Sequence, residues 1–192
     1  LESFISYVQD FTEDSSRIFC DLSQRSFIAI LDYHSAIKKK AAEKCQHRAM
    51  LNLQLSEAAQ AWIDRNRKSQ SQAEFADFLE DRFGDVVSPT GADMLEIAKT
   101  LEMKPDVHFK SAQRQHDGGY NLIFTENVTA AAGASGNLEV PERITIRIPL
   151  FAGGDPLELE ARLLYRISGG ALSFSVRFIR LEDILRDAVK AA

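Results

Sequence analysis

Four residues that can bind a metal lie close together in the N-terminal part of the sequence. Asp32 and His34 end one predicted strand, and Cys45 and His47 begin the next. Two imidazoles, a thiolate and a carboxylate are ligands that zinc accepts. Their spacing is not one of the recurrent zinc patterns, and a long segment separates the two pairs. We therefore predict no metal and no cofactor, and we interpret these residues as polar strand ends.

Motifs that carry well-known catalytic chemistry are missing from the sequence. It contains no GxSxG, no HExxH, no GxxxxGK[ST] and no paired CxxC. The segment AAAGASGN is rich in small residues, but no helix signal follows it, so no helix N-terminus is available to hold a phosphate. The sequence therefore favours a protein that is not an enzyme.

A second chemical feature is a row of basic side chains in the segment 107–128, VHFKSAQRQHDGGYNLIFTENV. The pair Asp117-Gly118 suits the positive φ of a tight turn, so this segment predicts a β-hairpin. Because side chains alternate along a strand, the basic residues share one face and Phe109 lies on the other. The basic face carries His108, Lys110, Arg114 and His116.

The same alternation continues in three later segments, 144–151, 157–167 and 171–180. In each of them apolar residues occupy one face and arginines the other. If these strands join the hairpin in one sheet, the outer face of that sheet is basic. We therefore propose as candidate nucleic-acid-binding residues Lys110, Arg114, Arg143, Arg147, Arg162, Arg166 and Arg177.

This basic face is open to three interpretations. Sheets that bind single-stranded nucleic acid usually stack bases on exposed aromatic side chains, whereas Phe109, Phe174 and Phe178 fall on the apolar faces of their strands. Glu158 and Glu160 share the outer face and can pair with the arginines. Three interpretations of the face therefore stay open: it contacts a polyanion, a protein partner or only water. Arginine is also enriched at protein interfaces.

Composition and charge exclude several classes of protein. The chain has 192 residues and a formal net charge of −5, so no global basic field attracts nucleic acid. No apolar run reaches the roughly 18 residues that span a membrane, and residues 1–12 lack the basic start of a signal peptide. Cys20 and Cys45, as two free thiols, favour a reducing compartment. We expect a cytoplasmic protein that does not bind a membrane.

The elements that position these residues follow from two periodicities. Apolar residues at helical spacing open the chain over 1–11, and three predicted strands follow as a meander. Helices then begin after Ser56, at the capping box SQAE of residues 71–74, and at SPTGAD. Gly84 is predicted as a left-handed helix stop. The last predicted helix spans 181–191.

This order of elements predicts an α+β fold. We expect an antiparallel β-sheet with helices packed on one face, together with the N-terminal three-stranded meander. The chain is predicted to form a single domain, 1–192, with a subdivision into 1–104 and 105–192 as the alternative. Exposed strand edges invite pairing, so we also expect a homo-oligomer.

Three stretches of the sequence resemble a known family. The C-terminal stretch IPLFAGGDPLELEARLLYRISGGALSFSVRFIRLEDILRDA is similar to the C-terminal signature of the YfdQ-like family of phage and prophage proteins. ADMLEIAKTLEMKPDVHFKSAQR and SQAEFADFLED resemble its middle section, and LESFISYVQDFTEDSSRIF resembles a segment inside full-length members. One departure is Arg180-Leu181, where the family tends to have Arg-Pro.

The resemblance implies a phage origin and an N-terminal stretch of the parent that is absent here. It implies no established activity and no catalytic residues; members tend to sit near phage replication and recombination genes. We therefore expect a non-enzymatic phage accessory protein of the host cytoplasm that binds nucleic acid during phage DNA replication or recombination. The alternative is an interaction module that inhibits or recruits a host protein.

Overall fold

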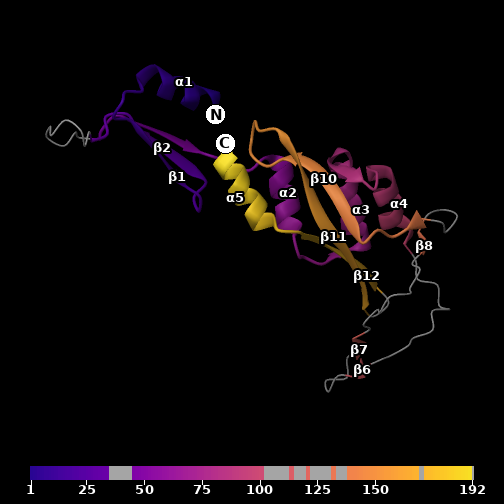
Figure 1. Cartoon of the computed structure of the whole chain (residues 1–192). Coiled ribbons are helices and arrows are strands. Elements are labelled where there is room, and N and C mark those ends of the chain that lie inside the picture. Colours follow the sequence, from indigo (N-terminus) through magenta and orange to yellow (C-terminus); the bar gives the residue numbers. More distant parts are fainter. Residues whose placement is uncertain are drawn as a thin grey trace. The chain divides into compact units, whose positions relative to one another are not determined.

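The computed structural model describes residues 1–34, 45–101, 138–168 and 171–191, and the short stretches 113–114, 120–121 and 131–132. Its contacts divide the chain into two compact units. The first unit consists of Leu1–Asp64, Ile148–Glu158 and Arg180–Ala192, and the second of Arg65–Arg147 and Leu159–Ile179. Figure 1 shows the elements of both units.

The first unit begins with helix α1 (Glu2–Phe11) and the predicted meander. Strands β1 (Arg17–Asp21), β2 (Ser26–Ile30) and β3 (Arg48–Asn52) form an antiparallel sheet of three strands in the order β1-β2-β3. Helix α1 packs against this sheet through a small core of Val8, Ala29 and Leu31, to which Phe4 and Ala49 are added. The meander is therefore a sheet of its own.

Two further helices belong to the first unit, α2 (Glu57–Arg65) and α5 (Leu181–Ala191). The Ser56 hydroxyl accepts a hydrogen bond from the Ala59 amide at 3.0 Å and so caps α2, as the sequence predicts. The Ser56 amide donates to the Leu150 carbonyl, and Leu55 bridges to Phe151. The start of α2 is thus held by residues almost a hundred positions later in the chain.

The second unit is built on a sheet of five strands in the order β4-β12-β11-β10-β5. Its long strands are β10 (Arg143–Pro149), β11 (Pro156–Ser168) and β12 (Ala171–Phe178), and its short edge strands are β4 (Gln70–Ser71) and β5 (Val86–Ser88). Strands β11 and β12 pair antiparallel from Ala161↔Phe178 to Ser168↔Ala171, which confirms the predicted hairpin.

Helices α3 (Gln72–Asp81) and α4 (Gly91–Thr100) lie together on one side of this sheet (Figure 1). Phe75 of α3 stacks on Phe174 of β12 with ring centroids 4.9 Å apart, and both side chains are fully buried. The described part of the chain is thus an α+β protein, as predicted, with a three-stranded and a five-stranded sheet as its main sheets.

The helix boundaries confirm most of the local signals. The predicted capping box at α3 is present: the Ser71 hydroxyl accepts from the Glu74 amide, and the Glu74 carboxylate accepts from the Ser71 amide. The prediction that Gly84 ends α3 in a left-handed conformation is wrong. The helix ends at Asp81, and Gly84 lies in a 3-10 turn, Phe83–Asp85, without a positive φ.

The predicted hairpin at 107–128 is described only in part. Strands β6 (Gln113–Arg114) and β7 (Tyr120–Asn121) pair antiparallel, with Arg114 opposite Tyr120, and form a separate sheet of two strands. The predicted turn at Asp117-Gly118 lies outside the described residues. A second short pair joins β8 (Ala131–Ala132) and β9 (Leu138–Glu139). Among the described helices, none is long and apolar enough to cross a membrane.

Candidate nucleic-acid interface

The outer face of β10 carries exposed arginines. Along this strand Ile144 and Ile146 are fully buried, while Arg143 and Arg147 are exposed. The alternation that the sequence predicts is therefore present, and the apolar face is the one that carries the core. Arg143 pairs with Glu160 of β11 at 3.4 Å, so β10 and β11 present these charged residues on the same face.

Strands β11 and β12 add three more exposed arginines to this face. Arg162 of β11 lies directly opposite Arg177 of β12, and Arg166 lies opposite Ser173. Residues directly opposite each other in an antiparallel pair have Cβ atoms about 5 Å apart. We call the resulting surface the arginine face; its members are Arg143, Arg147, Arg162, Arg166 and Arg177.

Two of the predicted candidate residues are not placed on this surface. Lys110 lies outside the described residues. Arg114 is on β6, whose two-stranded sheet is separate from the five-stranded one. The continuous basic surface that the sequence suggested from the hairpin to the later strands is therefore not seen in the described part of the chain.

The charges of the arginine face are largely without counter-charges. Arg143 has Glu160 as its partner, and both side chains are about 60 % exposed (61 % and 59 %). For Arg147, Arg162, Arg166 and Arg177, no carboxylate among the described residues lies within the 4.0 Å of an ion pair. Like charges directly opposite in a sheet repel, so Arg162 and Arg177 destabilise this pairing unless an anion lies near both.

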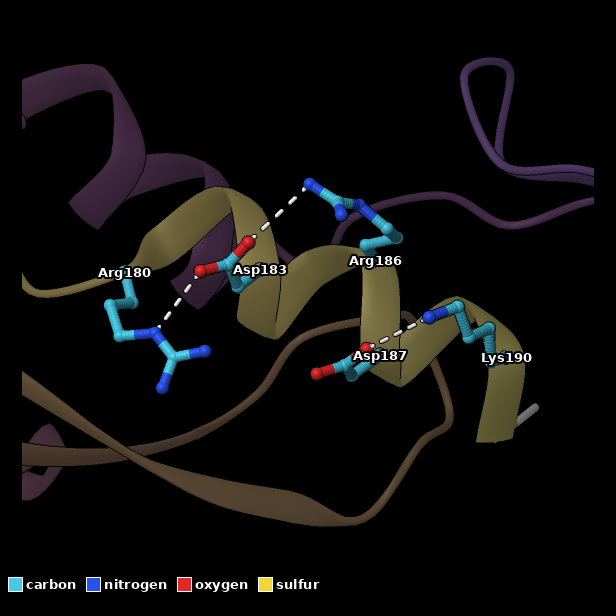
Figure 2. A network of polar contacts seen from close by, with 5 residues as sticks. All are labelled: Arg180, Asp183, Arg186, Asp187 and Lys190. Carbon is cyan, nitrogen blue, oxygen red and sulfur yellow. Dashed lines mark hydrogen bonds and ion pairs between the residues drawn. The ribbon is translucent and has the colours of Figure 1, made fainter.

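The exposed basic residues of α5 give a contrasting case. Asp183 lies between Arg180 and Arg186 and pairs with both, at 3.1 and 3.4 Å (Figure 2). Lys190 pairs with Asp187 at 3.2 Å one turn further along the helix (Figure 2). Arg180 and the basic groups of α5 thus have acidic neighbours three positions away, whereas Arg162 of β11 and Arg177 of β12 face each other.

Among the described residues of β10, β11 and β12, no aromatic ring lies on the arginine face. Phe174 and Phe178 are buried, on the opposite side of β12. Tyr165 is half-buried on the inner side of β11, and burial raises the pKa of its hydroxyl. The outer position between Arg162 and Arg166 is taken by Leu164, which is 41 % exposed. The surface therefore suits contacts to phosphates better than stacking on bases.

Two hydroxyl residues complete this surface and were not among the candidates taken from the sequence. Ser173 lies opposite Arg166, and Ser175 lies opposite Leu164. The Ser173 hydroxyl donates to the Arg166 carbonyl at 3.3 Å, and serine hydroxyls also donate to phosphate oxygens in many nucleic-acid complexes. Their position follows from the register of the β11–β12 pairing, which runs without a shift from Ala161↔Phe178 to Ser168↔Ala171.

Of the four possible metal ligands in the first unit, Cys45 and His34 lie next to each other, while Asp32 and His47 bond to other groups. Cys45 Sγ lies 3.6 Å from His34 Nε2. Desolvation raises the pKa of the Asp32 carboxyl, but hydrogen bonds from the Gln46 and His47 amides outweigh it, so the pKa is lowered. His47 Nε2 lies 2.9 Å from the Tyr7 hydroxyl. No group of three or more His, Cys, Asp or Glu that could hold a metal occurs in the described residues.

A pocket of about 580 Å³ lies in the first unit. Leu55 and Ile63 line it together with Arg25, Glu182 and Arg186. Arg186 already pairs with Asp183. The pocket is lined by one acidic side chain, two basic side chains and apolar groups, so its lining favours no ligand of one charge. The arginine face is the stronger candidate for binding an anion.

The fold and this surface define an α+β protein with an exposed, basic sheet face. The chain matches the family described as "Uncharacterized conserved protein (DUF2303)" over residues 1–192, and it belongs to this family. No curated protein and no solved structure matches the chain.

Proposed function

We propose that the protein is a non-enzymatic binding protein whose arginine face contacts the phosphate backbone of a nucleic acid. The observation that carries this proposal is the cross-strand pair Arg162 and Arg177, both exposed and without a carboxylate partner among the described residues. An anion bound between the two guanidinium groups removes their mutual repulsion. A phosphate also accepts two parallel hydrogen bonds from one guanidinium.

The spacing of the arginines fits a ligand with several phosphates. Arg162 and Arg166 are separated by four positions on β11, which corresponds to about 13 Å along a strand. A single small anion cannot reach both residues, whereas a polyanion can. The hydroxyls of Ser173 and Ser175 lie next to this row on β12. A phosphate backbone that runs along β11 would meet basic and hydroxyl groups in turn.

Binding of this kind is expected to depend little on base sequence. Contacts to phosphates fix the position of a nucleic acid but do not read its bases. The net charge of −5 adds a repulsive background, so binding should be weak and strongly dependent on salt. An accessory role in phage DNA replication or recombination, in the cytoplasm of the host, is the form of this function that the resemblance to phage proteins supports.

The test is fluorescence anisotropy with single-stranded and double-stranded DNA and RNA at about 50 to 200 mM salt. We expect Arg162→Glu/Arg177→Glu to weaken binding at least about tenfold and to reduce the salt slope by about two units. The matched control is Arg186→Glu/Lys190→Glu, which changes the net charge equally but lies on α5. Equal losses in both variants, or no binding by the wild type at low salt, would contradict the proposal.

A second candidate function is an interaction module that inhibits or recruits a host protein. Leu164 favours it, because this residue is 41 % exposed in the middle of the arginine face. An apolar residue surrounded by arginines is typical of the centre of a protein interface. One variant distinguishes the two proposed functions. Leu164→Ser should leave binding to nucleic acid almost unchanged, but it should abolish capture of a host protein.

A further inference from the structure

Strand β1 is exposed on both of its faces. Each of its five residues is exposed, including Ile18 at 57 % and Phe19 at 46 %. A strand of a small sheet normally buries one face, since its side chains alternate between core and solvent. Here α1 covers Ala29 and Ala49 on the neighbouring strands, but it does not cover Ile18, which is the cross-strand neighbour of Ala29.

Among the described residues, no strand pairs with the outer edge of β1. In the meander, Leu31 donates to the His47 carbonyl and Leu53 donates to the Arg25 carbonyl, so the odd-numbered residues of β2 bond to β3. Its even-numbered residues therefore bond to Arg17, Phe19 and Asp21 of β1. The backbone groups of Ile18 and Cys20 consequently point away from the sheet, at its open edge.

This edge lacks the features that usually prevent strands from pairing. Natural sheets protect their edges with lysine, proline or bulges. Strand β1 reads RIFCD, and its register with β2 is continuous over all five pairs. The two residues whose backbones face outward, Ile18 and Cys20, carry no charge. A strand with matching charges and apolar residues can therefore add to this edge.

The sequence of β1 complements itself. In an antiparallel pair of two copies centred on Phe19, Arg17 lies opposite Asp21, Ile18 opposite Cys20, and Phe19 opposite Phe19. Each charged end thus meets the opposite charge of the second copy, and apolar residues meet apolar residues. We propose that β1 pairs with β1 of a second copy across a two-fold axis at Phe19, so that the two meanders form one continuous sheet.

The backbone geometry selects this register. Only Ile18 and Cys20 offer outward hydrogen bonds, so they must pair with each other or with themselves. Pairing Ile18 with Ile18, or Cys20 with Cys20, leaves Arg17 and Asp21 without opposite charges. Pairing Ile18 with Cys20 forms four backbone hydrogen bonds and two ion pairs. Asp21 can take part, because in the described part of the chain its three hydrogen bonds all go to Oδ1.

The proposed pairing also extends an exposed apolar row. Phe19 lies opposite Ile28, and Ile28 lies opposite Met50, which is 64 % exposed. Opposite residues share a face, so these side chains form a row across the sheet. In the pair of copies the two rows meet at Phe19. The other edge strand, β3, lacks this match, because pairing centred on Met50 sets Arg48 opposite Asn52.

The first test is sedimentation equilibrium of the whole chain and of two charge variants. Arg17→Asp sets two carboxylates opposite each other at both ends of the pair, and Asp21→Lys sets an ammonium group opposite Arg17. We expect a concentration-dependent dimer for the wild type and at least tenfold weaker association for each variant alone. An equal mixture of the two variants should restore dimers, because opposite charges then face each other at both ends of the pair.

The recovery in the mixture separates pairing from a folding defect, since the mixture contains only the two variant chains. In the mixed pair, the two new side chains lie opposite each other at one end and form an ion pair of reversed polarity. At the other end, Asp21 of the Arg17→Asp chain lies opposite Arg17 of the Asp21→Lys chain, which is the wild-type ion pair. Both ends of the mixed dimer are therefore complementary.

The second test is disulfide cross-linking at the two-fold axis. In a chain that also carries Cys20→Ser and Cys45→Ser, Phe19→Cys should form an intermolecular disulfide. Non-hydrogen-bonded residues at such a centre have Cα atoms about 4.5 Å apart, within the range of a disulfide. Met50→Cys in the same background is the control and should not form one. A monomeric wild type, no recovery in the mixture, or equal cross-linking through position 50 would overturn the proposal.

Discussion

Side chains that bond to nearby backbone amides determine several features of this protein at the scale of single residues. Ser56, Ser71 and Thr90 each accept a hydrogen bond from the amide three positions later. Each satisfies an amide that the first turn of its helix leaves without a partner. Asp32 does the same for two amides at the start of the segment that leads into β3. The three helix caps need only a few neighbouring residues, so their sequence signals are reliable, whereas the bonds of Asp32 join residues 14 and 15 positions apart.

The capping box of α3 predicts a pH dependence. The Ser71 amide and hydroxyl donate to Glu74 and hold the pKa of its carboxyl below the ordinary value of 4.5. A lowered folded-state pKa stabilises the protein above the unfolded value, and this stabilisation is lost as the pH falls through the folded value. Urea unfolding at pH 7 and at about pH 3 should therefore show a smaller loss of stability in Glu74→Gln than in the wild type.

The matched control for this prediction is Asp77→Asn, which removes an exposed carboxylate from the same helix. Glu74 is unchanged in this control, so we expect the control to lose as much stability on acidification as the wild type. A Glu74→Gln variant with the pH dependence of the wild type would show that the capping carboxylate makes no contribution.

Two glycines predict opposite responses to the same substitution. A Cβ atom on Gly91, at the start of α4, would overlap the carbonyl oxygen of Phe83, whereas a Cβ on Gly84 would meet nothing within 4 Å. We expect Gly91→Ala to destabilise the protein by about 1–3 kcal/mol, although alanine favours helices. Gly84→Ala should be neutral or stabilising. Thermal unfolding of both variants tests this, and stabilisation by Gly91→Ala would contradict it.

At the scale of elements, alternation along the strands separates the core from the arginine face. Strand β12 shows this clearly, because Phe174 and Val176 are buried while Arg177 is exposed. The helix end at Asp81 shows the opposite case. The sequence indicated Gly84 as the stop, but the Arg82 amide bonds to the Phe78 carbonyl and a 3-10 turn follows. A glycine marks a permitted left-handed stop without requiring one.

The two faces of the five-stranded sheet predict different costs of truncation. Phe174→Ala removes a fully buried ring that stacks on Phe75, so it should destabilise the protein by about 3–5 kcal/mol. Leu164→Ala lies on the outer face and should change the stability by less than about 0.5 kcal/mol. Urea unfolding curves of the two variants test this difference, and similar costs would mean that the inner face does not carry the core.

At the scale of the whole molecule, each compact unit is assembled from distant parts of the sequence. The first unit combines Leu1–Asp64 with Ile148–Glu158 and Arg180–Ala192. The net charge of −5 likewise describes no particular surface, because the arginines of β10, β11 and β12 collect on one face. Properties summed over the chain therefore say little about where the protein binds a partner.

The assembly of the first unit predicts how a fragment behaves. Residues 1–64 contain α1, the meander and most of α2, but they lack the Leu150 carbonyl that accepts from Ser56 and the Phe151 bridge to Leu55. We expect fragment 1–64 to keep the strands of the meander and to lose α2, since an isolated helix this short is marginal in water. Backbone chemical shifts measure this, and helical shifts over 57–64 in the fragment would contradict it.

The sequence alone determined what depends on neighbouring residues. The α+β class, the three-stranded meander, the helix caps, the β11–β12 hairpin and the final helix all follow from short periodic patterns or from turn and cap residues. The outward position of Arg147, Arg162, Arg166 and Arg177 follows in the same way, because alternation is a local property of an extended chain.

Only the tertiary structure decided which strands far apart in the sequence are neighbours. It placed the two-residue strand β4 and the three-residue strand β5 at the edges of the five-stranded sheet, and it left β6 and β7 in a sheet of their own. It also set Arg162 opposite Arg177, and within the described part of the chain it left the outer edge of β1 without a partner strand. The pairing of such strands depends on the total of many contacts between residues far apart in the chain, and a local sequence pattern carries no information on those contacts.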